Sequence, residues 1–127
     1  MNEAGVEEEI KSYRDPRVWR KALELATEVY RLTRAWPKEE LYGLTSQARR
    51  AATSVPANIA EGCGRQDRGS YVQFLRIAQG SLKELETHLI LASKIGITAE
   101  AAIEPLLGQT DDLGKMLFGL IRKLSTD

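Results

Sequence analysis

The sequence predicts an all-α protein, an antiparallel up-down-up-down four-helix bundle. Apolar residues recur at alternating spacings of three and four over four long segments, which is the period of helices that bury one face. Aromatic residues make up only 6% of the 127 residues and proline occurs four times, a composition that favours helices packed on helices. Because the connections are short, each helix should run antiparallel to the one before it.

The first helix is expected over about residues 16–36. Asp15 can accept hydrogen bonds from the free amides of its first turn, and Pro16 presets the backbone there. Residues 1–14 precede it as a flexible acidic N-terminal arm, because they contain four glutamates and no apolar period. A second apolar stripe beside the main one is either additional core or an intersubunit face, and comprises Trp19, Leu23, Ala26 and Tyr30.

The second helix is expected over about residues 38–62. Its apolar seam comprises Leu41, Leu44, Ala48, Ala51, Val55 and Ile59. Pro56 lies inside this pattern, so the helix is either kinked near Pro56 or broken and restarted there; the unbroken seam favours a kink. Gly62-Cys63-Gly64 should end the helix, with one glycine in the left-handed conformation.

The third and fourth helices, over about residues 68–95 and 98–125, have the most regular patterns. The third should bury Tyr71, Leu75, Ala78, Leu82, Leu85, Leu89 and Ala92. The fourth should bury Ile103, Leu106, Thr110, Leu113, Leu117, Leu120 and Leu124. Its second stripe, Leu107, Phe118 and Ile121, is again either core or an intersubunit face.

A polar stripe on the second helix carries residues that core packing alone would not select. Gln47, Arg50, Ser54, Asn58 and Glu61 recur at helical spacing beside the apolar seam. The stripe is either a solvated or partly covered edge, or a binding or interface surface. An Arg50–Glu61 ion pair could fix helix order or subunit register.

Five stretches of the sequence form a recognisable set: Val18–Ala22, Gly43–Ala52, Val55–Gly62, Gly64-Arg65 and Phe74–Ser81. They resemble the bacterial family called four helix bundle proteins, whose founding members are intervening-sequence proteins encoded within insertions in 23S ribosomal RNA genes. The resemblance implies an up-down bundle that assembles as a homopentamer. It also extends, distantly, to accessory proteins of diversity-generating retroelements, which bind nucleic acid. The family motif marks Gln47, Arg49, Arg50, Asn58, Glu61, Gly62, Gly64 and Arg65.

Basic residues suggest a second possible function, the binding of structured RNA. The chain has no net charge, but residues 14–76 carry twelve basic and seven acidic residues, a net +5. Arg49, Arg50, Arg65, Arg68 and Arg76 surround one loop and its flanking helices and could contact phosphates. Tyr71 could stack on a base. The same arginines could instead have a structural or interface role, and Gly62-Cys63-Gly64 could be an anion nest or only a helix stop.

The sequence contains no pattern typical of an enzyme. Cys63 and His88 are its only cysteine and histidine, which excludes an internal disulfide and leaves too few ligands for a structural zinc site. Glu84 and His88 do not have the spacing of a di-iron bundle. We therefore expect a cytoplasmic, non-enzymatic assembly or adaptor module with no cofactor, metal, membrane contact or small-molecule substrate.

Overall fold

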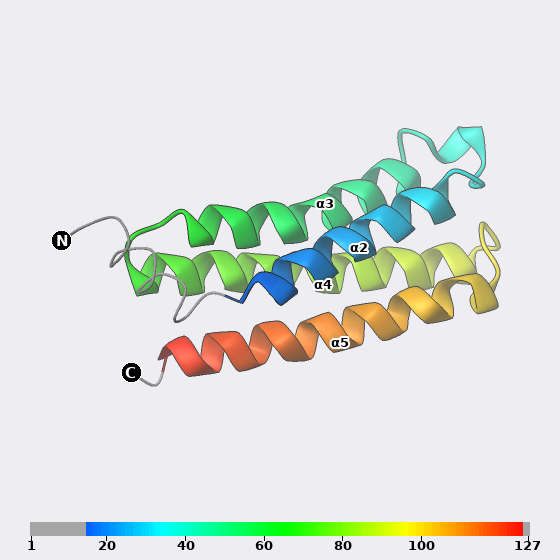
Figure 1. Cartoon of the computed structure of the whole chain (residues 1–127). Helices are drawn as coiled ribbons and strands as arrows, with labels where there is room; N and C mark the ends of the chain where they lie inside the picture. The colour runs from blue at the N-terminus through cyan, green and yellow to red at the C-terminus, as the bar shows by residue number, and fades with distance from the viewer. Residues whose placement is uncertain (1–14, 126–127) are drawn as a thin grey trace.

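The computed structural model describes residues 15–125, which form four long helices joined by short connections (Figure 1). The helices are α2 (Pro16–Thr33), α3 (Leu44–Cys63), α4 (Arg68–Lys94) and α5 (Glu100–Ser125), with a short 3-10 helix, η1 (Lys38–Glu40). Residues 1–14, expected to form an acidic arm, lie outside the described part of the chain.

The four long helices occupy the corners of a square. Each one packs against its two neighbours: α2 and α4 both contact α3 and α5, and α3–α4 is the most extensive of these interfaces. Successive helices alternate in direction, so that α2 and α4 begin at the end of the bundle where α5 finishes (Figure 1). The predicted up-down-up-down bundle is therefore confirmed.

The core contains the residues that the helical period selects. All seven positions predicted on α4 and all seven on α5 are buried, and so are Ala48, Ala51, Val55 and Ile59 on α3. Leu41 is the exception, with 46% of its surface exposed. It follows η1 in a turn rather than lying in a helix, so the periodicity of α3 does not apply to it.

The connection between α2 and α3 differs from the sequence prediction. Instead of one helix over 38–62, η1 is followed by a turn, and α3 begins only at Leu44. The Glu40 carboxylate accepts a hydrogen bond from the Leu44 amide at 3.2 Å, which satisfies one of the free donors at the start of α3. Helix α2 likewise ends at Thr33, three residues before the predicted limit, although Trp36 is still buried.

Pro56 lies buried within a continuous α3, so the alternative of a broken and restarted helix is wrong. A proline inside a helix removes one backbone donor, and its ring crowds the preceding turn. Here Val55 and Ile59, on either side, are both buried in the core. Packing of this face therefore offsets the local cost of the proline.

Gly62 allows α3 to approach α4 closely, and it does so without a left-handed conformation. A Cβ added at Gly62 would lie 2.9 Å from both the Phe74 Cβ and the Tyr71 Cδ1. Among the described residues, only Gly96 has a positive φ, at 84°, so the left-handed glycine expected at Gly62-Cys63-Gly64 is wrong. Gly64 caps α3 in the right-handed region, with φ −76°.

Local hydrogen bonds close the end of α4 and the starts of α4 and α2. Gly96 closes α4 because the Ile97 amide donates to the Ala92 carbonyl at 2.9 Å, a Schellman arrangement. Asp67 starts α4 by accepting from the Ser70 amide at 2.8 Å, and this hydrogen bond holds the pKa of the carboxyl below its usual value. Asp15 starts α2, where hydrogen bonds from Arg17 lower its pKa. No helix within residues 15–125 is long and apolar enough to cross a membrane.

Removing a fully buried side chain from α4 should destabilise the subunit. We expect Leu85→Ala to lower the free energy of unfolding by about 2–5 kcal/mol, because Leu85 is completely buried and its loss leaves a cavity. Urea unfolding monitored by circular dichroism would measure this. Leu91→Ala is the matched control, since Leu91 lies on the exposed side of the same helix. Equal effects of the two changes would contradict the assigned core face.

The close approach of α3 to α4 at Gly62 leads to a second prediction. We expect Gly62→Ala to destabilise the protein by about 1–3 kcal/mol, because the added methyl group overlaps Tyr71 and Phe74. Gly119→Ala, in open space on α5, should instead stabilise it by up to about 1 kcal/mol. Thermal and urea unfolding would compare the two. A stabilised Gly62→Ala variant would show that α3 and α4 are not held this closely.

Candidate functional site

A polar groove of about 490 Å³ lies between α3 and α4. Helix α3 contributes part of the predicted polar stripe, and α4 contributes three further polar residues. We call this the α3–α4 polar groove; its polar lining comprises Gln47, Arg50, Ser54, Ser81, Glu84 and His88. The tertiary structure therefore brings Glu84 and His88, which the sequence analysis considered only against the spacing of a di-iron bundle, next to the stripe.

Two residues that line this groove, Ser54 and Ser81, belong to a short chain of hydrogen bonds. The hydroxyls of Ser54 and Ser81 lie 2.8 Å apart across the two helices. The Asn58 amide donates to the Ser54 carbonyl at 2.8 Å and to its hydroxyl at 2.9 Å. Because these groups satisfy one another in a partly buried position, they fix α3 against α4 rather than leaving donors free for a ligand.

Sequence reasoning identified the α3 half of this groove but not its partner. Ser81 is buried on a helix face otherwise composed of apolar residues, and Gly80 next to it lies in open space. The two adjacent small residues Gly80 and Ser81 could therefore have indicated, from the sequence, that another helix packs closely at this point. Only Ser81 contacts α3. The suggested Arg50–Glu61 pair does not form: Glu61 accepts instead from Arg65, in the connection that follows α3, at 2.9 Å.

Arg49 faces away from the α3–α4 polar groove and binds α2. Its Nε donates to the Thr33 hydroxyl at 2.8 Å, and its guanidinium lies 4.5 Å from the centre of the Tyr30 ring. The hydrogen bond to Thr33 is partly buried, and both contacts connect the two helices. Arg49 thus holds α3 to α2, whereas the neighbouring Arg50 is exposed at the polar groove.

The remaining arginines of the proposed nucleic-acid set point in other directions. Arg65 pairs with Glu61 and lies 5.0 Å from the Phe74 ring centre. Arg76 lines a separate groove between α4 and α5, and Arg68 is half-buried in the first turn of α4. The five side chains therefore do not converge on one surface.

Tyr71 does not offer a surface for base stacking, so that interpretation is wrong. Only 1% of its surface is exposed, because it packs under the close approach of α3 at Gly62. The Cys63 thiol, half-buried, donates to its hydroxyl at 3.5 Å. No group of three or more histidine, cysteine or acidic residues within residues 15–125 has the arrangement of a metal site.

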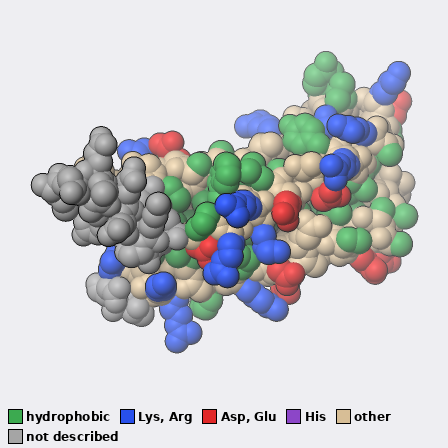
Figure 2. Space-filling model, in the orientation of Figure 1, with side chains coloured by type: hydrophobic (Ala, Val, Ile, Leu, Met, Phe, Trp, Pro, Cys, Tyr) green, Lys and Arg blue, Asp and Glu red, His purple; other side chains and the backbone are tan. Residues whose placement is uncertain are grey.

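An exposed apolar surface lies along α2 where it meets α3. Trp19, Leu23 and Tyr30 are 41%, 39% and 40% exposed, whereas Ala26 of the same stripe is buried. Trp19 lines a shallow pocket of about 290 Å³ with Ala60 and Cys63 of α3. We call Trp19, Leu23 and Tyr30 the α2–α3 apolar face. Figure 2 shows apolar side chains exposed among charged ones on this side of the molecule.

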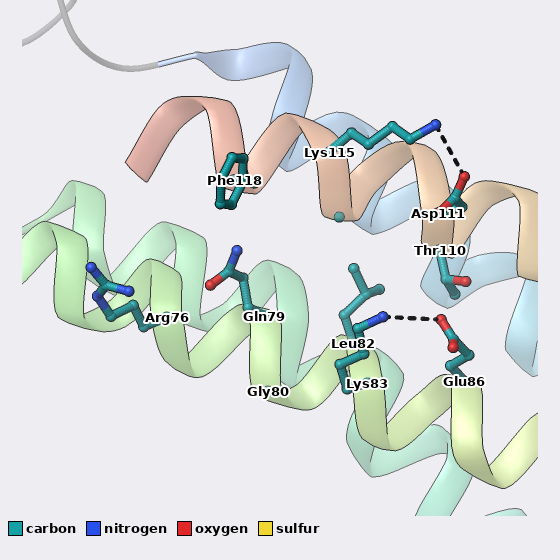
Figure 3. Close-up of a pocket in the computed structure, with 11 residues that line it drawn as sticks. Arg76, Gln79, Gly80, Leu82, Lys83, Glu86, Thr110, Asp111, Lys115 and Phe118 are labelled. Atoms are coloured by element: carbon teal, nitrogen blue, oxygen red, sulfur yellow. Dashed lines mark ion pairs between the residues drawn. The ribbon is translucent and has the colours of Figure 1, made fainter. Parts of the chain in front are cut away.

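A second groove, of about 590 Å³, separates α4 from α5 (Figure 3). Leu82 points into it from α4, and Phe118, 60% exposed, stands on its α5 wall near Gln79 and Arg76. Its rim carries two ion pairs, Lys83–Glu86 at 3.7 Å and Lys115–Asp111 at 3.3 Å. We call this the α4–α5 groove. Of the second stripe predicted on α5, Phe118 is therefore exposed while Ile121 is buried.

Comparisons with known proteins agree on one family. The family model described as 23S rRNA-intervening sequence protein matches residues 14–119. A similar crystal structure is that of a protein of unknown function from the S23 ribosomal protein family of Bacteroides thetaiotaomicron. It is 25% identical, with a TM-score of 0.74, and the match covers 82% of this chain and 97% of that one. None of the curated proteins matches this chain.

The two adjacent arginines of α3 should differ in their effect on stability. We expect Arg49→Ala to lower the free energy of unfolding by about 1–2 kcal/mol, because it removes the bond to Thr33 and the contact with Tyr30. Arg50→Ala, at an exposed position, should change it by less than about 0.5 kcal/mol. Urea unfolding would compare them, and indistinguishable variants would contradict the structural role of Arg49.

Proposed function

Because this chain belongs to the family of 23S rRNA-intervening sequence proteins, we propose that it is a cytoplasmic, non-enzymatic bundle that self-assembles and acts as an assembly or adaptor module. The observation that carries this proposal is the α2–α3 apolar face. Three large side chains of one helix are each about two-fifths exposed there, although the core beneath them is complete without them.

The chemistry of this face favours contact with protein rather than with water. Although 28% of the residues in the chain are charged, Trp19, Leu23 and Tyr30 lie at spacings of four and seven with no charged side chain within the stripe itself. Large apolar side chains exposed along one face of a helix are typical of interaction sites. Burying it in a partner would stabilise the complex by roughly 25 cal/mol for each Å² of apolar area removed from water.

We propose a closed ring of copies as the assembly, with five subunits as the resemblance to the family implies. A ring of five requires that two different surfaces of the subunit meet at every interface. The bundle offers the α2–α3 apolar face and, separately, the α4–α5 groove.

RNA binding through the arginines receives less support from the geometry. Arg49 and Arg65 are engaged within the subunit, and Arg76 opens into a different groove from Arg50. The chain also has no net charge. Binding to RNA is therefore an alternative outcome of the experiment below.

The proposal predicts a stable assembly that does not depend on salt or RNA. Light scattering coupled to size exclusion should give the same multimeric mass at low and high salt, with or without a structured RNA. The double substitution Trp19→Ser/Leu23→Ser should reduce the mass to that of one chain, since it removes the apolar face. Leu91→Ser, at an exposed leucine outside both surfaces, is the control.

Two results would count against this function. A wild-type protein that stays monomeric at all concentrations tested would refute self-assembly. A complex that forms with RNA at low salt and dissolves at high salt would favour the arginine hypothesis, because phosphate contacts release counterions.

A further inference from the structure

The α3–α4 polar groove carries one positive and one negative side chain on its facing walls. Ser54 and Ser81 meet across the two helices, which run in opposite directions (Figure 1). One turn further along the groove, Arg50 of α3 therefore lies opposite Glu84 of α4. Ala51, which lines the groove beside Arg50, is small and buried, so the space between the two charged side chains stays open.

The longer polar side chains of this groove are not engaged within the subunit. Among residues 15–125, the side chains of Gln47, Arg50, Glu84 and His88 form no hydrogen bond or ion pair. By contrast, both carboxylates that line the α4–α5 groove are paired with a lysine. Arg50 and Glu84 thus line the same space with all their side-chain donors and acceptors available.

The two charges select the class of molecule that this groove can bind. An anion would be attracted by Arg50 but repelled by Glu84, and a cation would be attracted by Glu84 but repelled by Arg50. An apolar molecule would gain little, because Ala51 is the one apolar residue in the described lining. A small molecule that carries both a carboxylate and an ammonium group satisfies both walls at once.

We propose that the α3–α4 polar groove binds a free polar α-amino acid. The carboxylate of the ligand accepts two hydrogen bonds from the planar guanidinium of Arg50, and its ammonium group donates to the carboxylate of Glu84. The Gln47 amide and the His88 imidazole supply donors and acceptors for a polar side chain of the ligand. Because both walls belong to long, extensively packed helices, the groove exists before the ligand arrives.

The single histidine of the chain provides a direct test. His88 lines the groove, so its imidazole protons give one NMR signal set that reports on this site alone. At constant pH, we expect L-serine to shift these signals to saturation with a Kd of about 1 mM. N-acetyl-L-serine, which lacks the ammonium charge, and L-serinamide, which lacks the carboxylate, should each bind at least about tenfold more weakly.

Two variants assign the contacts to the two walls. Arg50→Gln and Glu84→Gln each remove one charge and keep a polar side chain of similar length. Each should weaken the binding of L-serine at least about tenfold, because one charge-assisted contact is lost. Arg20→Gln, at an exposed arginine of α2, is the matched control and should leave the Kd unchanged. Circular dichroism melts confirm that all three variants are folded.

Several results would overturn this inference without touching the proposed self-assembly. His88 signals that stay in place at about 50 mM L-serine would show that the groove binds no amino acid, since the proposed contacts are to groups that all α-amino acids share. Equal binding of N-acetyl-L-serine would make it an anion site, and equal binding of L-serinamide a cation site. Unchanged binding by both glutamine variants would place the ligand elsewhere.

Discussion

The close contact between α3 and α4 is the constraint on which the rest of the subunit depends. Gly62 has no side chain at the point where α3 passes over Tyr71 and Phe74, and the Ser54 and Ser81 hydroxyls meet further along the same interface. A larger residue at either position would separate the two helices. Helix α2 packs on α3 and helix α5 packs on α4, so both outer helices are placed against this closely packed pair.

Close packing of α3 and α4 also explains why the polar stripe lines a groove instead of a flat surface. Ser54 and Asn58 are drawn into the helix interface and satisfy each other's hydrogen bonds, while Arg50 stays at the rim. On the other side of α3, Arg49 reaches α2 and fixes it through Thr33. Adjacent residues of one motif therefore serve two different interfaces, because successive helical positions point about 100° apart.

Apolar side chains remain exposed on this bundle after its core is complete. The core residues of all four helices are buried within one subunit, yet Trp19, Leu23, Tyr30 and Phe118 are exposed. Exposed aromatic residues of this size have a cost in water, which association with another copy would remove.

Helical periodicity by itself determined the number, order and buried faces of the helices, because burial of one face is a local requirement that repeats every three or four residues. All seven core positions that it predicted on α4 and all seven on α5 are buried. The end of α2 and the start of α3 depended on local turn and capping hydrogen bonds around η1, and the conformation of Gly62 depended on the close approach of α4, so the periodicity did not predict them. Packing also decided the site. Gln47, Arg50 and Ser54 were visible in the sequence as a stripe, but only the packing of α4 brought Ser81, Glu84 and His88 next to them.

Periodicity also found the second apolar stripes of the first and fourth helices. Only the tertiary structure decided that Ala26 and Ile121 are core while Trp19 and Phe118 face outward, because burial at these positions depends on which of them a neighbouring helix covers.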